Sequence, residues 1–239
     1  MCTKKKGQQM MDANKILENL IANISLISPE DIPNISLYMD QVTTFMDNHL
    51  YSAKRFDEEK ALTKTMINNY AKNELLPSPE KKKYTKDHIL LLTFIYYFKS
   101  VLSINDIKKL LQPISDKYFQ SESGASLEDI YAELEEYMSS INETVKNDVK
   151  SKSEDAKNSF TDDIFKDLSS KDTNYLKLFK FISMLCFDIY LKKQLIESII
   201  DTLDEPLSKA EKEKRAKKEM EAKEKRLKKE REEREKFKK

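Results

Sequence analysis

The chain has 239 residues, of which 39% are apolar and 36% are charged. Globular domains carry roughly a quarter of charged residues, so part of this chain is expected to lie outside a packed core. The chain holds two glycines and no tryptophan. This leaves little material for the tight turns of an all-β architecture or for a glycine-rich nucleotide loop, and both classes are excluded. We therefore predict an all-α protein.

The formal net charge of +1 is the sum of four unequal blocks. Residues 1–60 carry −2, residues 61–112 carry +5, residues 113–206 carry −9 and residues 207–239 carry +7. A local electrostatic field acts on whatever approaches that part of the surface, so this asymmetry indicates a charged partner. The positive block at 61–112 is the first place to look for one.

Cysteine usage and hydropathy indicate a cytoplasmic protein without a membrane anchor. Cys2 and Cys186 are far apart and no metal-ligand spacing surrounds either, which is typical of a reduced compartment. The longest uncharged apolar run, Ile89 to Phe98, has ten residues and is too short to cross a bilayer. The basic start of the chain is followed by a stretch that polar residues interrupt, which does not fit a signal peptide.

Hydrophobic periodicity and capping residues predict a succession of helices. Thr63, Thr85, Ser103 and Ser126 are the expected N-cap residues of four of them, and Pro113 is expected to end the fifth. In chain order the predicted helices span about 12–28, 36–49, 63–73, 86–99, 104–111, 127–150 and 174–203.

The remaining segments set the domain boundaries. Lys81 to Tyr84 is expected to be a short extended or turn segment, and Cys186 is expected on the buried side of the last helix. The tail is predicted to be a solvated, fraying helix, because its ion pairs four residues apart contribute only a few tenths of a kcal/mol each. The predicted regions are an N-terminal amphipathic helix at 1–29, a helix-turn-helix-like domain at 30–112, an acidic helical region at 113–206 and a charged tail at 207–239.

Residues 62–84 contain a pattern that suits nucleic acid binding. A short capped helix carries hydroxyl and amide side chains, and a lysine-rich turn follows it. Asparagine can read adenine through two hydrogen bonds, and lysine binds phosphate as a point charge. A plainer alternative is that the lysines form a solvated turn and that the two tyrosines of the pattern pack at the edge of the core. The candidate DNA contacts are Lys64, Thr65, Asn68, Asn69, Tyr70, Lys72, Lys81, Lys82, Lys83 and Tyr84.

Three motifs in this region resemble the winged helix-turn-helix of mercury-resistance-type (MerR) regulators. They are Ile67-x-x-Tyr70-x-x-x-x-Leu75-Leu76-Pro77, Lys83-Tyr84-Thr85-x-Asp87 and Leu102-Ser103-Ile104-x-x-Ile107-x-x-Leu110-Leu111. The resemblance implies a recognition helix in the major groove and a wing on the phosphate backbone. The chain departs from the family pattern at Asn68-Asn69-Tyr70, where Arg-Tyr-Tyr is usual, at Glu74, where glycine is usual, and in a polar insertion at 51–61. Lysines also stand where the wing commonly has arginine.

A second resemblance covers a longer stretch. Asp31-Ile32-Pro33-Asn34-Ile35-x-Leu37-Tyr38-Met39-Asp40-Gln41-Val42-Thr43 and the residues from Leu62 to Leu111 look like a bacterial family known as domain of unknown function 1836. This resemblance extends over roughly residues 30–200, and it implies no particular activity.

These patterns lead to the hypothesis of a DNA-binding transcriptional regulator. In this hypothesis the helices at 127–150 and 174–203 provide a homodimer interface, and the acidic half is held away from the phosphates. The alternative is a non-enzymatic helical protein-interaction module. A third interpretation assigns nonspecific nucleic acid affinity to the tail alone, because 16 of its 33 residues are basic.

Catalytic chemistry finds little support in the sequence. His49 and His88 are the only histidines, and neither has a second ligand three or four residues away, so both are expected at helix ends or on the surface. An acidic solvated helix face explains the carboxylates of residues 113–206, and no nucleophile context surrounds a serine or cysteine. We therefore expect no enzyme activity, no metal and no cofactor.

Overall fold

A computed structural model describes residues 27–51, 58–122 and 124–203, together with the single positions 16, 18, 19, 56, 211, 214, 217 and 220. The chain divides into two units, residues 1–202 and 203–239, and every helix and strand with defined bounds lies in the first. The helices predicted at 12–28 and in the tail fall largely outside the described residues.

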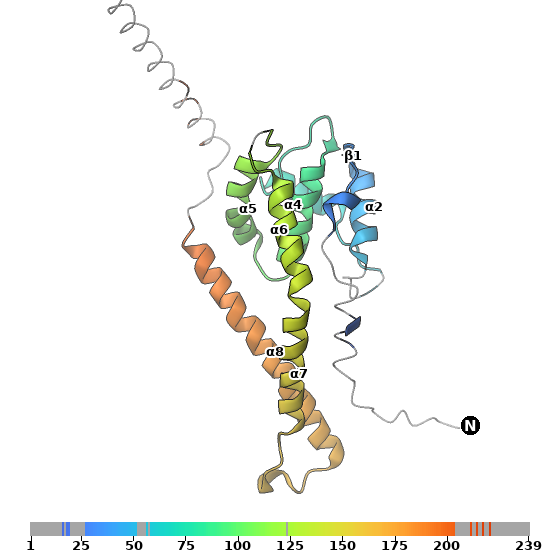
Figure 1. Ribbon diagram of the computed structural model, residues 1–239, viewed down its shortest axis with the longest axis vertical. Helices are drawn as coiled ribbons and strands as arrows, with labels where there is room; N and C mark the ends of the chain where they lie inside the picture. Colours follow the sequence, from blue (N-terminus) through green and yellow to red (C-terminus); the bar gives the residue numbers. More distant parts are fainter. Residues whose placement is uncertain are drawn as a thin grey trace, which may run out of the picture. The chain divides into compact units, whose positions relative to one another are not determined.

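The first unit is mostly helical, as predicted, with one two-stranded sheet among its described residues (Figure 1). None of the helices within the described ranges is long and apolar enough to cross a membrane. In chain order the elements are η1 (Pro29–Asp31), β1 (Leu37–Tyr38), α2 (Met39–His49), α3 (Lys64–Lys72), β2 (Lys83–Tyr84), α4 (Lys86–Phe98), α5 (Ile104–Tyr118), α6 (Leu127–Ser140), α7 (Asn142–Lys157), η3 (Asp163–Phe165) and α8 (Ser170–Asp201).

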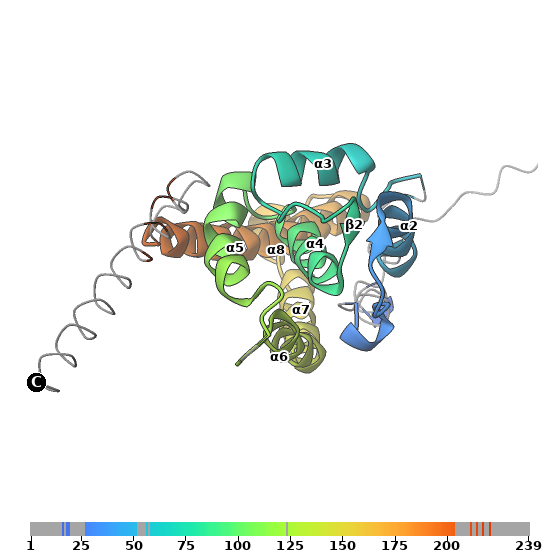
Figure 2. The ribbon, with the colours of Figure 1, turned by 90° about the horizontal axis from the view of Figure 1, so that it is seen from above.

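Helix α4 forms the centre of the core. Every residue from His88 to Ile95 is buried, which fits a helix that is apolar on nearly all sides. The one hydroxyl in this run, on Thr93, donates a hydrogen bond to the carbonyl of Ile89 at 2.9 Å, so its burial leaves no donor unpaired. Helices α2, α5 and α6 and strand β2 pack around α4, and α3 crosses one side of the group (Figure 2).

The sheet is a short antiparallel ladder that pairs Leu37 with Tyr84 and Tyr38 with Lys83. Leu37 and Tyr84 face the core, while their neighbours face solvent. The ladder fixes the lysine turn against the start of α2. Helix α2 therefore begins at Met39, later than the predicted start at residue 36, because the residues before it are used for strand pairing.

The predicted helix starts are confirmed at four positions. The hydroxyls of Thr63, Ser103 and Ser126 accept hydrogen bonds from the third amide of α3, α5 and α6. Thr85 forms a capping box with His88 at the start of α4. Each such cap satisfies backbone donors that a helix start leaves unpaired, which fixes where the helix begins.

The predicted end of the fifth helix at residue 111 is wrong. Helix α5 continues through Pro113 to Tyr118. A proline inside a helix costs about 3 kcal/mol, because it lacks the N–H that bonds four residues back. Ile114 and Tyr118, which lie beyond the proline, both pack against the core. The burial of these side chains offsets the cost of the proline.

The predicted single helix at 127–150 is two helices. The break lies at Ile141, which keeps helical dihedral angles of φ −72° and ψ −16°, so α6 and α7 are nearly continuous and the second reaches Lys157. Helix α8 then returns alongside α7. Ion pairs join Lys152 to Asp188 at 2.6 Å and Lys180 to Asp155 at 3.8 Å across the two helices.

Helix α8 is much less buried than predicted. It begins at Ser170, earlier than residue 174, because Ser169 caps it by accepting from the amide of Asp172 at 3.2 Å. Ile200 is its one buried residue, and Cys186 is exposed. The expectation that Cys186 packs in the core is wrong, because the sequence pattern shows an apolar face but does not show whether anything covers it.

Candidate nucleic-acid interface

Helix α3 has one buried face and one exposed polar face. Ile67 is fully buried and Tyr70 is 6% exposed, so these two side chains fix the helix to the core. The exposed face repeats every four residues, which is the spacing of one helix side. It contains Lys64, Thr65, Asn68, Asn69 and Lys72.

Tyr70 and Tyr84 do not belong to this exposed face. Tyr84 is 3% exposed, and the rings of Tyr84 and His88 pack edge to face at a centroid distance of 5.3 Å. Burial raises the pKa of both tyrosine hydroxyls above its ordinary value. The expectation that these two side chains contact DNA is therefore corrected, because both pack in the core as the plainer alternative had it.

Helix α3 ends in a Schellman motif with a glutamate at the left-handed position. The amide of Leu75 donates to the carbonyl of Tyr70 at 2.9 Å, and the amide of Glu74 donates to that of Ala71 at 3.2 Å. Glu74 has a φ of 59°, which glycine adopts without steric cost and other residues adopt with strain. The position where the MerR pattern has glycine is thus one that needs left-handed backbone. The Glu74 carboxylate also forms an ion pair of 3.3 Å with Lys108 of α5.

Replacing Glu74 by glycine should raise the free energy of unfolding by about 1 kcal/mol, because relief of the left-handed strain exceeds the loss of one exposed ion pair. The Glu74→Gln variant is the matched control, since it loses the same ion pair and keeps the strain. Urea denaturation followed by circular dichroism compares the two. A glycine variant no more stable than the glutamine variant would contradict the role given to this backbone position.

The lysine turn has the same kind of backbone strain at two consecutive residues. Lys81 and Lys82 have φ values of 49° and 63°, and the amide of Lys83 donates to the carbonyl of Glu80 at 2.8 Å. Positive φ at both central residues is the pattern of a type I′ turn, which normally takes Asn-Gly. All three lysines are exposed. Strain that the surrounding fold maintains at an exposed turn is a feature found at binding sites.

The start of α2 lies between the lysine turn and α3. The ammonium of Lys83 lies 5.5 Å from the ring centroid of Tyr38, which is 54% exposed. Two residues further on, Asp40 forms an ion pair with Lys64 at the start of α3. Lys83 of the lysine turn and Lys64 of α3 therefore both contact the segment from Tyr38 to Asp40. Sequence reasoning missed Tyr38 as part of this surface, because a strand of two residues gives no periodic signal.

His88 is a buried side chain at the start of α4, just after the lysine turn. Its Nδ1 accepts a hydrogen bond from the amide of Thr85 at 3.0 Å, and its ring also meets the ring of Phe119 edge-on at 4.8 Å. The side chain is 2% exposed. Burial lowers the pKa of His88 from 6.5 to about 4, and the backbone carbonyl of Pro77 acts in the opposite direction. The prediction that His88 serves a helix end is confirmed.

A hollow of about 200 Å³ lies beside the turn, and its lining includes Ser36, Lys81, Lys83 and Gln120. This is smaller than the roughly 300 Å³ at which pockets for small organic ligands begin, so the hollow is not assigned a ligand. In the part of the chain that the structure describes, no group of three or more His, Cys, Asp or Glu side chains is placed to hold a metal ion.

Comparison with known families covers this part of the chain. Residues 27–134 match the family model of the domain of unknown function DUF1836. No curated protein and no solved structure matches the chain. The DUF1836 segment starts just before η1 and ends in α6, so it contains the whole surface described above. The second resemblance in the sequence is confirmed over this segment, and the rest of its expected range, up to residue 200, lies outside the match.

Proposed function

We propose that the DUF1836 segment binds duplex DNA as a transcriptional regulator of MerR-like type. The exposed face of α3 enters the major groove, and the lysine turn contacts the phosphate backbone. One observation carries this proposal: a polar helix face and a lysine-rich turn are both exposed, and both are fixed to the same rigid core. Binding through preformed elements avoids the entropy cost of ordering them.

The exposed residues divide into two chemical roles. Asn68 and Asn69 are placed to read base edges, since an asparagine amide can pair with adenine through two hydrogen bonds. Lys64, Lys72 and the turn lysines supply positive charge to phosphates. A helix of this length is about 13 Å long, which is comparable with the roughly 12 Å width of the major groove.

The order of the elements supports a MerR-like arrangement. A strand, two helices and a second strand follow one another from β1 to β2, and the strands pair with each other. The connection between α2 and α3, residues 50–63, is longer than the turn of three or four residues usual in a helix-turn-helix. The proposed contact places the exposed face of α3 in the major groove of DNA, and it does not require a tight turn between α2 and α3.

Replacing Lys81, Lys82 and Lys83 together by alanine tests the proposal. Each lysine that no longer binds a phosphate should reduce the salt-dependence slope by about 0.9, so the triple variant should show a slope smaller by about 3 units, with affinity reduced at least about tenfold. Fluorescence polarisation with duplex DNA at several salt concentrations measures both quantities.

The matched control replaces Lys157, Lys166 and Lys171, three exposed lysines at the far end of the α7–α8 hairpin. Both variants keep the basic tail, so the contribution of the tail is the same in each. Equal affinity of the two variants would place DNA binding elsewhere, and loss of all binding when the chain is truncated after Pro206 would assign it to residues 207–239.

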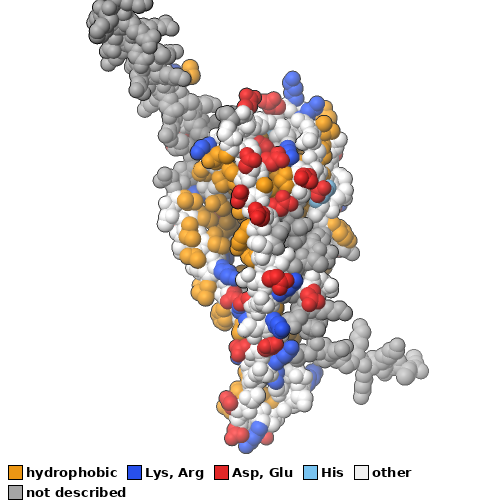
Figure 3. All heavy atoms as spheres, in the orientation of Figure 1, with side chains coloured by type: hydrophobic (Ala, Val, Ile, Leu, Met, Phe, Trp, Pro, Cys, Tyr) orange, Lys and Arg blue, Asp and Glu red, His pale blue; other side chains and the backbone are white. Residues whose placement is uncertain are grey.

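One observation favours the second candidate, a helical protein-interaction module. Helix α8 leaves a large apolar surface uncovered, as shown in Figure 3, where hydrophobic side chains gather along it on the visible face. A chain that binds no duplex at low salt, but forms a defined protein complex, would support this candidate over the regulator.

A further inference from the structure

Helix α8 has an apolar surface that its own chain does not cover. Ten of its large apolar side chains are between 43% and 67% exposed. At roughly 100 Å² each, they leave on the order of 1,000 Å² of apolar surface in water. Six of the ten lie on or beside one side of the helix and give that side roughly 600 Å², the upper end of the 300–600 Å² that a monomeric protein exposes in its largest apolar patch.

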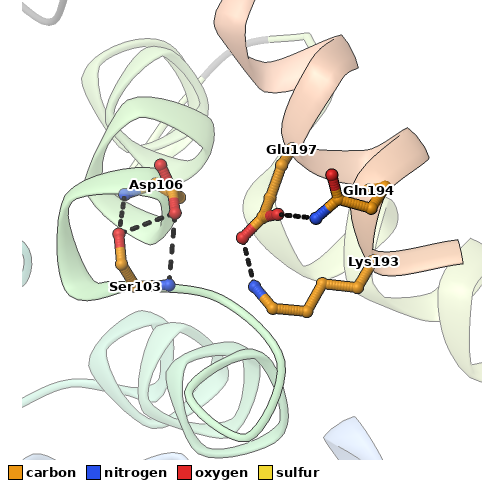
Figure 4. Close-up of polar contacts among 5 residues, drawn as sticks. All are labelled: Ser103, Asp106, Lys193, Gln194 and Glu197. Atoms are coloured by element: carbon orange, nitrogen blue, oxygen red, sulfur yellow. Dashed lines mark hydrogen bonds and ion pairs between the residues drawn. The ribbon is translucent and has the colours of Figure 1, made fainter. Parts of the chain in front are cut away.

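The intramolecular contacts of α8 leave this surface free. Lys180 donates to Ser159, just after the end of α7, at 2.6 Å, and Asp188 in the middle of α8 pairs with Lys152 of α7, so the side that carries them faces α7. Near the end of the helix, the polar group of Lys193, Gln194 and Glu197 lies opposite the first turn of α5 (Figure 4). Between these contacts, the side opposite α7 has no covering element among the described residues.

The residues on that side have the spacing of a coiled-coil seam. Their separations are four, three, four and three residues, which is the repeat of the two core positions of a heptad. The same register continues through Lys193 and Ile196 to Ile200, where the side chain is 2% exposed in the core of its own chain. The exposed seam contains Tyr175, Phe179, Ile182, Cys186 and Ile189.

We propose that this seam joins two copies of the chain, with α8 of one packed against α8 of the other. A heptad seam needs a partner helix with a matching seam, and a second copy supplies an identical one about a two-fold axis. With the flanking Leu178 and Tyr190, the seam exposes six of these side chains, roughly 600 Å², and a polar rim brings this near the roughly 800 Å² that each partner buries in a standard protein interface. The proposal does not depend on DNA binding, since no residue of the candidate interface lies on α8.

The oligomeric state of the full chain tests the proposal. Sedimentation equilibrium of the wild-type chain should give twice the mass of one chain. The double variant Ile182→Glu/Ile189→Glu should give the mass of one chain, because it places like charges in the seam. The matched control is Ile164→Glu, at a position that is 82% exposed but lies on η3, and it should remain a dimer. Circular dichroism confirms that each variant keeps its helices.

Crosslinking through Cys186 tests the same contact without placing a charge in the seam. With Cys2 replaced by serine, Cys186 is the single cysteine, and it lies within the exposed seam. A short bis-maleimide should join two chains covalently, and the further Cys186→Ser change should abolish the product. A wild-type chain that sediments with the mass of one chain, or a crosslinked yield unaltered by the seam glutamates, would overturn the proposal.

Discussion

Lowering the pH from about 6.5 to about 4 should reduce the free energy of unfolding by roughly 3 kcal/mol through His88 alone. The folded protein holds the pKa of this imidazole at about 4, because burial disfavours the charged ring. The unfolded chain binds a proton near pH 6.5, so it gains protons first as the pH falls. The contribution of His88 to stability is therefore complete above about pH 6.5 and is lost progressively down to about pH 4.

The His88→Gln variant isolates this effect. Glutamine at the third helical position can still accept from the Thr85 amide, as in an ordinary capping box, but it does not titrate. The variant should lose stability at neutral pH, because the contacts of the ring with Tyr84 and Phe119 disappear. Its stability should then change much less than that of the wild type between about pH 6.5 and 4.

Asp87 makes the comparison with the variant necessary. Burial raises the pKa of its carboxyl, so Asp87 increases the free energy of unfolding as the pH falls. In the wild type this increase partly masks the loss caused by His88. The difference between wild type and variant cancels this contribution. His49→Gln, at an exposed histidine on the end of α2, is the control and should keep the wild-type loss. Urea denaturation at several pH values measures all three proteins, and parallel pH profiles for wild type and His88→Gln would contradict the argument.

Changing the lysine turn to Lys81→Asn/Lys82→Gly should stabilise the fold while weakening DNA binding. Asparagine and glycine adopt the two left-handed conformations of a type I′ turn readily, and relief of strain at two positions should raise the free energy of unfolding by about 2 kcal/mol. The same change removes two ammonium groups, which should reduce the salt-dependence slope by about 2 units.

A glutamine pair at the same two positions separates strain from charge. Lys81→Gln/Lys82→Gln removes the same charges and keeps residues that adopt left-handed backbone with difficulty. Its DNA affinity should fall as far as that of the Asn-Gly variant, without the gain in stability. Thermal denaturation and fluorescence polarisation on both variants give the two quantities. An Asn-Gly variant that binds DNA as tightly as the wild type would remove the turn from the proposed interface.

The sequence predicted best where local chemistry decides the structure. Thr63, Ser103 and Ser126 were identified as N-caps because a hydroxyl before an apolar run satisfies helix amides whatever the rest of the fold does. The polar face of α3 was predictable for a similar reason, since spacing alone determines which side chains share a helix side.

Predictions that depend on distant parts of the chain were less accurate. Pro113 signals a helix end locally, and only the packing of Ile114 and Tyr118 on the core carries α5 past it. Tyrosine occurs both in DNA contacts and in cores, so the residue type alone does not predict where Tyr70 lies. The elements that pack on α3 decide its burial. The exposed seam of α8 has the same apolar spacing as a buried helix face. A heptad pattern predicts that a helix packs against this side, but it does not tell whether that helix belongs to the same chain or to another.

The β1–β2 ladder has a consequence for how the candidate interface comes to exist. Pairing Leu37 with Tyr84 closes a loop of about 45 residues, which costs roughly 3 kcal/mol of chain entropy. Two residues per strand form too few hydrogen bonds to offset this cost alone, at about 1 kcal/mol each. The ladder is therefore stable only together with the packing of α2 and β2 on α4, so the lysine turn holds its place only in the folded chain. A peptide with residues 62–85 would contain every lysine of the proposed interface, but without β1 and α4 it would not hold these lysines in one surface.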